Sequence, residues 1–282
     1  MEQNNKQDTY MPMTSIKSGK LTQVAEDVHC FTNQIVNLYF VGHTENWVLV
    51  DAGMPKSYHK IMEQAETLFG ENATPKALIL THGHFDHVGA AEELVEKWNI
   101  PVFAHPLELP FLTGEESYSY PDSSVEGGMV AKISDLFPEE PIHLGRNISP
   151  LPEDGTVPGM AGWKWLHTPG HTPGHVSFFR ESDKALLAGD AFITVKQDEL
   201  LKVVMQTKEV NGPPRYYTPD WDASEISVQK LAALHPTAAG TGHGIPIFGD
   251  ELTAGLQKLV RNFKTIAVPD YGKYVENQAK DE

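Results

Sequence analysis

A short apolar run and a histidine-rich loop meet in one stretch, Ala77-Leu78-Ile79-Leu80-Thr81-His82-Gly83-His84-Phe85-Asp86-His87. The run 77–80 lies between Pro75 and Gly83 and is typical of a buried strand. Apolar residues then recur at helical spacing from Val88 to Trp98, which predicts a helix over 88–98 that begins near Asp86. The histidines therefore occupy a strand-to-helix loop, where a rigid scaffold commonly holds reactive side chains.

This loop has the composition of a metal site. His82 and His84 alternate with Gly83, whereas Asp86 and His87 leave at the start of the helix, so the two pairs are expected to serve two different ions. Imidazole and carboxylate without a thiol suit zinc, manganese or ferrous iron. A single histidine at a strand end is usually just a hydrogen-bonded residue. Four ligand-type residues within six positions favour a metal, because burying them without a partner is costly.

Composition limits the partners of the chain. The 282 residues suffice for one large domain or two small ones with a sizeable core. A net charge of −16 and a pI of about 5.2 repel phosphate backbones and anionic lipids. We therefore expect a small-molecule substrate, no nucleic acid and no membrane partner, although the same acidic surplus also serves solubility alone.

Cysteine use and the N-terminal sequence lead to an expected location. The single cysteine, Cys30, excludes an intrachain disulfide and lies in an apolar run, where packed cysteines are more common than nucleophiles. Residues 1–20 are polar, with no apolar segment behind a basic start, so no secretion signal is predicted. No stretch approaches the ~20 apolar residues that span a bilayer. The expectation is a cytoplasmic protein.

The hydrophobic pattern predicts one domain over residues 21–270, with mobile tails at 1–20 and 271–282. Short β-like runs separated by turn residues indicate an antiparallel meander at 21–24, 28–31, 35–41 and 47–50. Helices are predicted at 56–69, 88–98, 223–234 and 250–263. Further strands are predicted at 101–103, 163–167, 176–179, 185–188 and 238–242. The two β-rich halves, 21–103 and 163–242, suggest two facing sheets.

Two segments have a less regular pattern. Residues 106–140 contain four prolines and a Ser/Tyr/Glu-rich patch. They are expected to form helical pieces and loops, either as a lid that shapes a pocket or as a surface excursion. Residues 194–220 are expected to form a helix and a proline-rich loop. Specificity would depend on these two segments.

Three later residues share the context of the histidine loop. His171, Asp190 and His243 each follow an apolar β run and lie beside a glycine. Each of these residues alone is weak evidence for a metal site, because any polar residue can end a strand. Together with the loop they supply two adjacent sites. One ion could be held by His82, His84 and His171. A second could be held by Asp86, His87 and His243. Asp190 could bridge both, and two metals about 3.5–4 Å apart can share a hydroxide formed at neutral pH.

The order of these motifs, His-X-His-X-Asp-His, Thr-Pro-Gly-His, Gly-Asp and Gly-His-Gly, resembles the metallo-β-lactamase superfamily over about residues 21–264. The resemblance implies an α+β fold, namely an αββα sandwich of two mixed β-sheets face to face, with helices outside and two intact metal sites at one edge. Asp51 is a further mark in the same order; it could orient metal ligands or cap a turn. His175 matches no ligand position and is expected to be structural.

Departures within that superfamily narrow the expected activity. True β-lactamases do not carry the bridging aspartate, so Asp190 argues against antibiotic hydrolysis. Lactonases that open acyl-homoserine lactones have a tyrosine three residues after it, where this chain has Ile193, although Tyr216 or Tyr217 could substitute. Glyoxalase II resembles the site closely, but its helical C-terminal region binds glutathione, and only 39 residues follow His243 here.

The expected activity is hydrolysis of an ester-like carbonyl (ester, lactone or thioester) by a metal-bridging hydroxide, with zinc preferred and Mn²⁺ or Fe²⁺ as alternatives. Asp86 is the expected catalytic residue, which orients the hydroxide and carries its proton to the leaving group. Two other functions stay open. One is phosphodiester hydrolysis by the same ions. The other is a non-catalytic metal-binding sensor, against which a bridging carboxylate argues, because structural zinc sites are closed.

Overall fold

Two mixed β-sheets form the centre of the structure, a computed structural model that describes residues 14–126, 132 and 142–275. The first sheet has the strand order β1-β2-β3-β4-β5-β6-β7. Its strands are β1 (Lys20–Ala25), β2 (Val28–Asn33), β3 (Val36–His43), β4 (Asn46–Val50), β5 (Leu78–Ile79), β6 (Val102–Ala104) and β7 (Ile148–Pro150). Neighbours are antiparallel from β1 to β4 and parallel from β4 to β7.

The second sheet has the order β13-β12-β11-β10-β9-β8. Its strands are β8 (Thr156–Val157), β9 (Met160–His167), β10 (Val176–Arg180), β11 (Ala185–Leu187), β12 (Ala238–Gly240) and β13 (Ile247–Phe248). Only the β11–β12 pair is parallel among these described strands.

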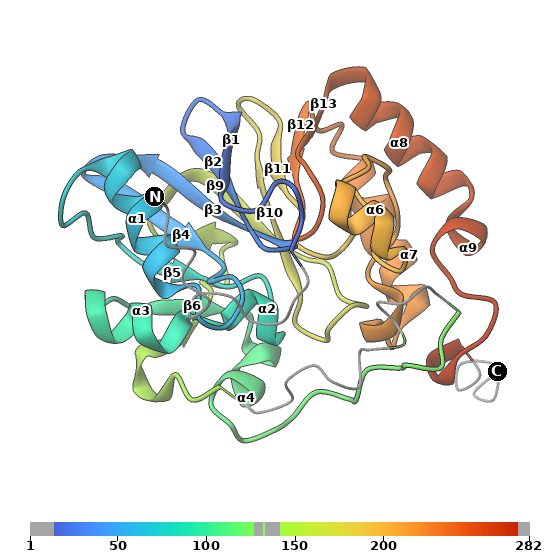
Figure 1. Ribbon diagram of the computed structural model, residues 1–282, viewed down its shortest axis with the longest axis horizontal. Helices are drawn as coiled ribbons and strands as arrows, with labels where there is room; N and C mark the ends of the chain where they lie inside the picture. Colours follow the sequence, from blue (N-terminus) through green and yellow to red (C-terminus); the bar gives the residue numbers. More distant parts are fainter. Residues whose placement is uncertain (1–13, 127–131, 133–141, 276–282) are drawn as a thin grey trace.

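Helices cover the outer face of each sheet (Figure 1). The first sheet carries α1 (Tyr58–Phe69) and α3 (Ala91–Trp98), and the second carries α7 (Trp221–Ala232) and α8 (Gly249–Arg261). The shorter helical pieces are α2 (Phe85–Val88), η2 (Pro106–Glu108), α4 (Leu109–Leu112), η4 (Gly145–Asn147), α6 (Leu200–Met205), η5 (Arg215–Tyr217) and α9 (Phe263–Ile266). The predicted αββα sandwich is confirmed. Among the described residues, no helix has both the length and the apolar character needed to cross a membrane.

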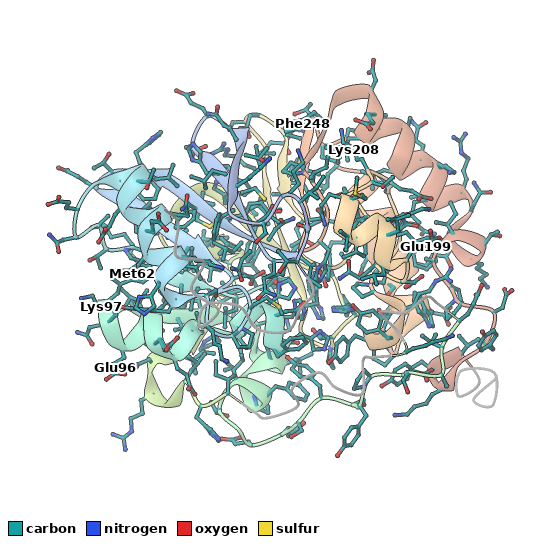
Figure 2. The ribbon with its side chains drawn as sticks, viewed as in Figure 1. Met62, Glu96, Lys97, Glu199, Lys208 and Phe248 are labelled. Atoms are coloured by element: carbon teal, nitrogen blue, oxygen red, sulfur yellow. The ribbon has the colours of Figure 1, made fainter. Side chains whose placement is uncertain are left out.

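Alternation along the central strands explains why apolar layers lie on both sides of the first sheet. In β3, Leu38 and Phe40 pack toward the helices, whereas Tyr39 and Val41 face the second sheet, as the two-residue period of a strand requires. Trp47 of β4 stacks on Phe69 of α1, with ring centroids 4.5 Å apart. Burial of each such large apolar side chain contributes about 1.5–3 kcal/mol. Figure 2 labels the exposed Glu96 and Lys97 of α3 and Met62 of α1, which is half-buried against this core.

The helix predicted over 88–98 is interrupted. The structure has α2 and α3 in its place, because the backbone between them bonds to another loop. Gly89 N–H donates to Gly53 O at 2.8 Å, and Ala90 N–H donates to Ala52 O at 3.2 Å. These N–H groups are therefore unavailable to continue the helical ladder of the ligand-bearing turn. A Cβ atom at Gly89 would lie 2.1 Å from the backbone nitrogen of Pro55, so only glycine fits this contact.

The predicted tails and the 106–140 segment are described only in part, and residues 1–13, 127–131, 133–141 and 276–282 lie outside the described residues. Within the first twenty residues, Ser15 N–H donates to Gln34 O at 3.1 Å. Near the other end, the hydroxyl of Tyr274 donates to Tyr120 O. The described part of the 106–140 segment thus contacts the C-terminal residues.

Candidate metal centre

Four strand ends bring the predicted site residues to one edge of the two sheets. The histidine loop follows β5, and His171 follows β9. Asp190 follows β11, and His243 follows the neighbouring parallel strand β12. Gly83 leaves no room for a larger residue in the histidine loop, because a Cβ atom there would lie 2.5 Å from the Tyr118 hydroxyl oxygen. The seven predicted ligands therefore lie at one edge of the sheets, five of them in loops and two, Asp86 and His87, in α2.

The structure gathers these residues into two adjacent groups. The first half-site consists of His82, His84 and His171, whose donor atoms lie within 4.8 Å of one another. The second half-site consists of Asp86, His87 and His243, grouped by the same distance. His84 Nδ1 and His171 Nε2 are 3.0 Å apart, and Asp86 Oδ2 lies 3.4 Å from His243 Nε2.

Asp190 faces both half-sites. Its Oδ2 atom lies 3.4 Å from His171 Nε2, in the first half-site. The same atom lies 3.6 Å from His87 Nε2 and 3.3 Å from His243 Nε2, in the second. One carboxylate oxygen is thus within reach of nitrogens on both sides, the position that a bridging ligand requires.

Unpartnered buried atoms test whether this cluster fits a cation. Among the described residues, the buried atoms without a hydrogen-bond partner include His82 Nε2, His87 Nε2 and Asp190 Oδ1. Each orphaned polar atom costs free energy, and native proteins rarely keep several together without a ligand or water. Because a divalent cation would satisfy nitrogen and carboxylate donors at once, the residues fit a metal centre without sulfur.

In three of the imidazoles, the ring nitrogen that points away from the cluster lies beside a polar partner. These partners fix the direction of the three rings. His87 Nδ1 lies 2.8 Å from Asp51 Oδ2, and His171 Nδ1 lies 3.1 Å from Thr218 Oγ1. His243 Nδ1 donates to Ile35 O at 3.0 Å. With Nδ1 as the donor, each Nε2 keeps a lone pair aimed at the centre, as in metal sites whose outer partners set the tautomer.

Asp51 links the second half-site to the strand before it. Besides His87, it accepts the backbone N–H and the hydroxyl of Thr81, each at 2.8 Å. The Thr81 hydroxyl oxygen in turn lies 3.0 Å from His82 Nδ1. Asp51 has a φ of 61°, in the left-handed region that is costly for a residue with a side chain and is enriched at functional sites. Of the two roles left open for it, the geometry favours orientation of ligands.

His175 positions the shared aspartate. The backbone N–H of Asp190 donates to His175 Nε2 at 2.9 Å, while His175 Nδ1 lies 2.9 Å from Thr168 Oγ1. Both ring nitrogens are occupied, so His175 holds the backbone of Asp190 in place, in agreement with the structural role expected for it.

The two half-sites differ in their electrostatics. Burial lowers the pKa of His82 and His171 well below the ordinary value, and lowers that of His84 to about 3. These imidazoles are therefore neutral near pH 7, the form that binds cations. Burial also acts to lower the pKa of His87 and His243, but the carboxylates of Asp190 and Asp86 outweigh it and raise both.

Glu108 is a functional candidate that the sequence did not single out. It is fully buried and accepts hydrogen bonds from both ligand-bearing loops: from Gly83 N–H at 2.9 Å, and from Gly174 N–H and the Thr172 hydroxyl, each at 2.7 Å. The Tyr118 hydroxyl also donates to it. Glu108 thus braces the loop of His84 against the loop of His171. A lone glutamate in a proline-rich segment gives no pattern from which this could be predicted.

A cavity of about 250 Å³ opens directly over the first half-site. Its lining residues are His84, Phe111, Glu116, Ser117, Tyr118, Ser119, His171, Pro173, Tyr217, Pro219 and Tyr274. The Tyr217 ring stacks on His84, with centroids 4.4 Å apart. A larger hollow, of about 380 Å³, lies on the outer side of α1 and α3 beside Met62 and Lys97 (Figure 2) and includes none of the predicted ligands. The smaller cavity is therefore the candidate substrate pocket.

Known proteins resemble this chain in sequence and in fold. Residues 32–243 match the family described as the metallo-beta-lactamase superfamily. A probable metallo-hydrolase of Bacillus subtilis (strain 168), YflN, is 47% identical over 264 residues, covering 92% of this chain and 99% of that protein. The hydroxyacylglutathione hydrolase GloC of Haemophilus influenzae is 28% identical over 148 residues, covering 52% of this chain and 61% of GloC. The structure of TTHA1623 in a di-iron-bound form has 29% identity and a TM-score of 0.53, covering 80% of this chain and 92% of that one. On this evidence the chain belongs to the metallo-β-lactamase superfamily and is a metallo-hydrolase.

Proposed function

We propose that the chain is a dinuclear hydrolase that attacks the carbonyl of a small ester, lactone or thioester. The seven clustered side chains would hold two divalent ions, one in each half-site, with Asp190 shared between them. The observation that carries the proposal is the set of buried donor atoms, His82 Nε2, His87 Nε2 and Asp190 Oδ1, that converge without hydrogen-bond partners.

When bound, two such ions supply an activated water at neutral pH and polarise the substrate carbonyl. The carboxylates of the chain then divide the remaining work. The side chain of Asp86 is 13% exposed, whereas that of Asp190 is 2% exposed, so a water or leaving group can reach Asp86 far more easily. Asp86 accepts the proton of the attacking water and passes it to the leaving oxygen or sulfur. Asp190 stays buried as a shared ligand.

The relatives support the reaction class and the two ions. GloC is named for hydrolysis of a hydroxyacylglutathione, which is a thioester, and TTHA1623 was crystallised in a di-iron-bound form. The donor set of imidazole and carboxylate is compatible with iron as well as with zinc or manganese. We keep zinc as the first choice. The net charge of −16 supports a small-molecule substrate rather than nucleic acid, and the single buried cysteine is in keeping with the cytoplasm.

A substrate panel combined with metal removal tests the proposal. The purified protein is assayed with carboxylic esters, thioesters, lactones and phosphodiesters, and its metal content is measured by elemental analysis. We expect about two ions per chain and turnover of a carbonyl substrate that a chelator abolishes and added metal restores. Turnover of phosphodiesters alone would instead identify a phosphodiesterase. Loss of the fold on chelation, with no turnover of any substrate, would identify a structural metal site.

A further inference from the structure

Aromatic side chains form much of the lining of the candidate pocket. Phe111 and Tyr118 stack with centroids 4.0 Å apart and an angle of 9° between their planes. Tyr118 also lies against His84 at 4.7 Å, and Tyr217 stacks on the same imidazole. Tyr274 completes this lining. A flat apolar group that enters beside the first half-site would therefore contact ring faces and edges, which favour stacked and edge-on partners.

The charged side chains that line the pocket are of one sign, negative. Among the described residues that line it, Glu116 is the only side chain with a permanent charge, and neither lysine nor arginine is present. Lys273 places its ammonium 5.0 Å from the Tyr274 ring but does not belong to the lining. Recognition of carboxylate or phosphate groups normally uses arginine or lysine. Apart from the proposed ions, the described lining offers an anionic group no cationic side chain and one carboxylate, Glu116.

We propose that this pocket selects an uncharged substrate whose acyl side carries a small aromatic or apolar group, and that Glu116 discriminates against substrates with an additional negative charge. The inference rests on the proposed hydrolysis of an ester-like carbonyl and names its substrate class. The volume of about 250 Å³ is below the ~300–1,000 Å³ of pockets for drug-sized ligands, which favours a small substrate.

This selection separates the chain from its relative GloC. A glutathione conjugate carries two carboxylates and would need cationic partners, which the described lining lacks. A neutral aryl ester or thioester needs none and buries its ring against Phe111 and Tyr118. Distinct substrates on a shared metal site are expected when the pocket walls differ.

A matched pair of substrates and a matched pair of variants test whether Glu116 discriminates against a negatively charged substrate. The metal-loaded enzyme is assayed with phenylacetyl and para-carboxyphenylacetyl esters of the same leaving group. We expect kcat/KM to be about tenfold or more in favour of the neutral ester, and Glu116→Gln to narrow that ratio by about three- to tenfold, the size of a screened interaction between two charges. Glu115→Gln is the control, because Glu115 is the adjacent exposed glutamate outside the lining.

A further variant tests whether the aromatic lining favours an aromatic acyl group. Phe111→Ala is expected to lower kcat/KM for the phenylacetyl ester about tenfold more than it lowers kcat/KM for the acetyl ester, since the ring of Phe111 offers a stacking surface that the acetyl group is too small to use. Leu107→Ala is the control, because Leu107 is an exposed apolar residue of the same segment outside the lining. Circular dichroism spectra establish that each variant is folded.

The outcomes distinguish this inference from the proposed function. Equal turnover of the neutral and charged esters, or equal effects of the two glutamate variants, would overturn the selection while leaving ester hydrolysis in place. Preference for the charged ester would overturn it as well. Absence of turnover for every ester and thioester by the metal-loaded enzyme would overturn both.

Discussion

The two half-sites of the metal centre are supported by different kinds of residue. Around the first, tyrosine rings lie against His84 and a threonine hydroxyl holds His171. Around the second, carboxylates dominate, because Asp51 holds His87 and Asp86 faces His243. In the proposed enzyme, the substrate would therefore approach the first half-site from the pocket, whereas the second half-site concentrates negative charge.

That difference has a consequence for the order of metal binding. A cation in the second half-site would lie near Asp86 and Asp190, with Asp51 behind His87. A cation in the first half-site would meet neutral imidazoles and the Asp190 carboxylate, which lies 3.4 Å from His171 Nε2. Since close negative charges favour a cation in a weakly screened site, we expect a chelator to empty the first half-site before the second.

Asp190→Asn should have the largest effect, because the Oδ2 atom that it alters lies near both half-sites. We expect kcat/KM to fall about a thousandfold, since several kcal/mol of transition-state stabilisation depend on the paired ions. Elemental analysis should find fewer than two ions per chain. Asp183→Asn, at a surface aspartate paired with Arg180, is the control. Full metal content and turnover in the Asp190 variant would show that the two half-sites do not share this residue.

Asp51→Asn should weaken the second half-site more than the first. The variant loses the carboxylate that fixes His87, and loss of such an outer partner typically costs 10–100-fold in metal affinity. We expect metal titration by calorimetry to show one ion weakened by that factor and a smaller loss for the other, because Asp51 also reaches His82 through the Thr81 hydroxyl. Thr218→Val, which removes the partner of His171, is the matching change on the other side and should weaken the other ion. If both variants weakened the same ion most, the division into half-sites would be wrong.

The metal cluster could be predicted from the sequence because its pattern is local. Four of its residues lie within six positions of the sequence, and His171, Asp190 and His243 each follow an apolar strand beside a glycine. The strand ends that carry them meet at one edge of the sheets, so short-range patterns were enough to predict the cluster that the structure then brought together.

The surroundings of the cluster depend on long-range contacts and were not predicted. Glu108 meets Gly174 across 66 positions of chain, and no periodicity of either residue indicates that contact. The break between α2 and α3 likewise depends on the distant loop at Gly53. The prediction of a single helix was wrong there, because helical spacing records only which residues are apolar and not where the backbone hydrogen bonds go.

Glu108→Gln should loosen the first half-site without removing a ligand. The amide can no longer accept at both ends, so Gly174 N–H and the Thr172 hydroxyl, or Gly83 N–H and Tyr118, lose their acceptor. We expect kcat to fall about tenfold, which corresponds to ~1.4 kcal/mol. KM should change less, because the variant misaligns the two loops but removes no ligand. Asp154→Asn is the control, since Asp154 also accepts an N–H and a hydroxyl but on the distant β8 turn. Equal effects of the two variants on kcat would show that Glu108 contributes only to stability.

His105→Asn should have the smallest effect, seen in stability rather than turnover. Burial and the stacked His167 ring lower the pKa of His105 from 6.5 to about 4. The unfolded chain therefore binds a proton that the folded chain does not, so this residue destabilises the fold progressively as pH falls from about 6.5 to about 4. Asparagine can still accept from Leu107 N–H, as His105 does, but does not titrate. We expect the drop in Tm between neutral and mildly acidic pH to be about 2–4 °C smaller in the variant, measured on chelator-treated protein. His59→Asn, at an exposed histidine of α1, should leave that drop unchanged, and an equal improvement in both variants would mean that the acid sensitivity arises elsewhere.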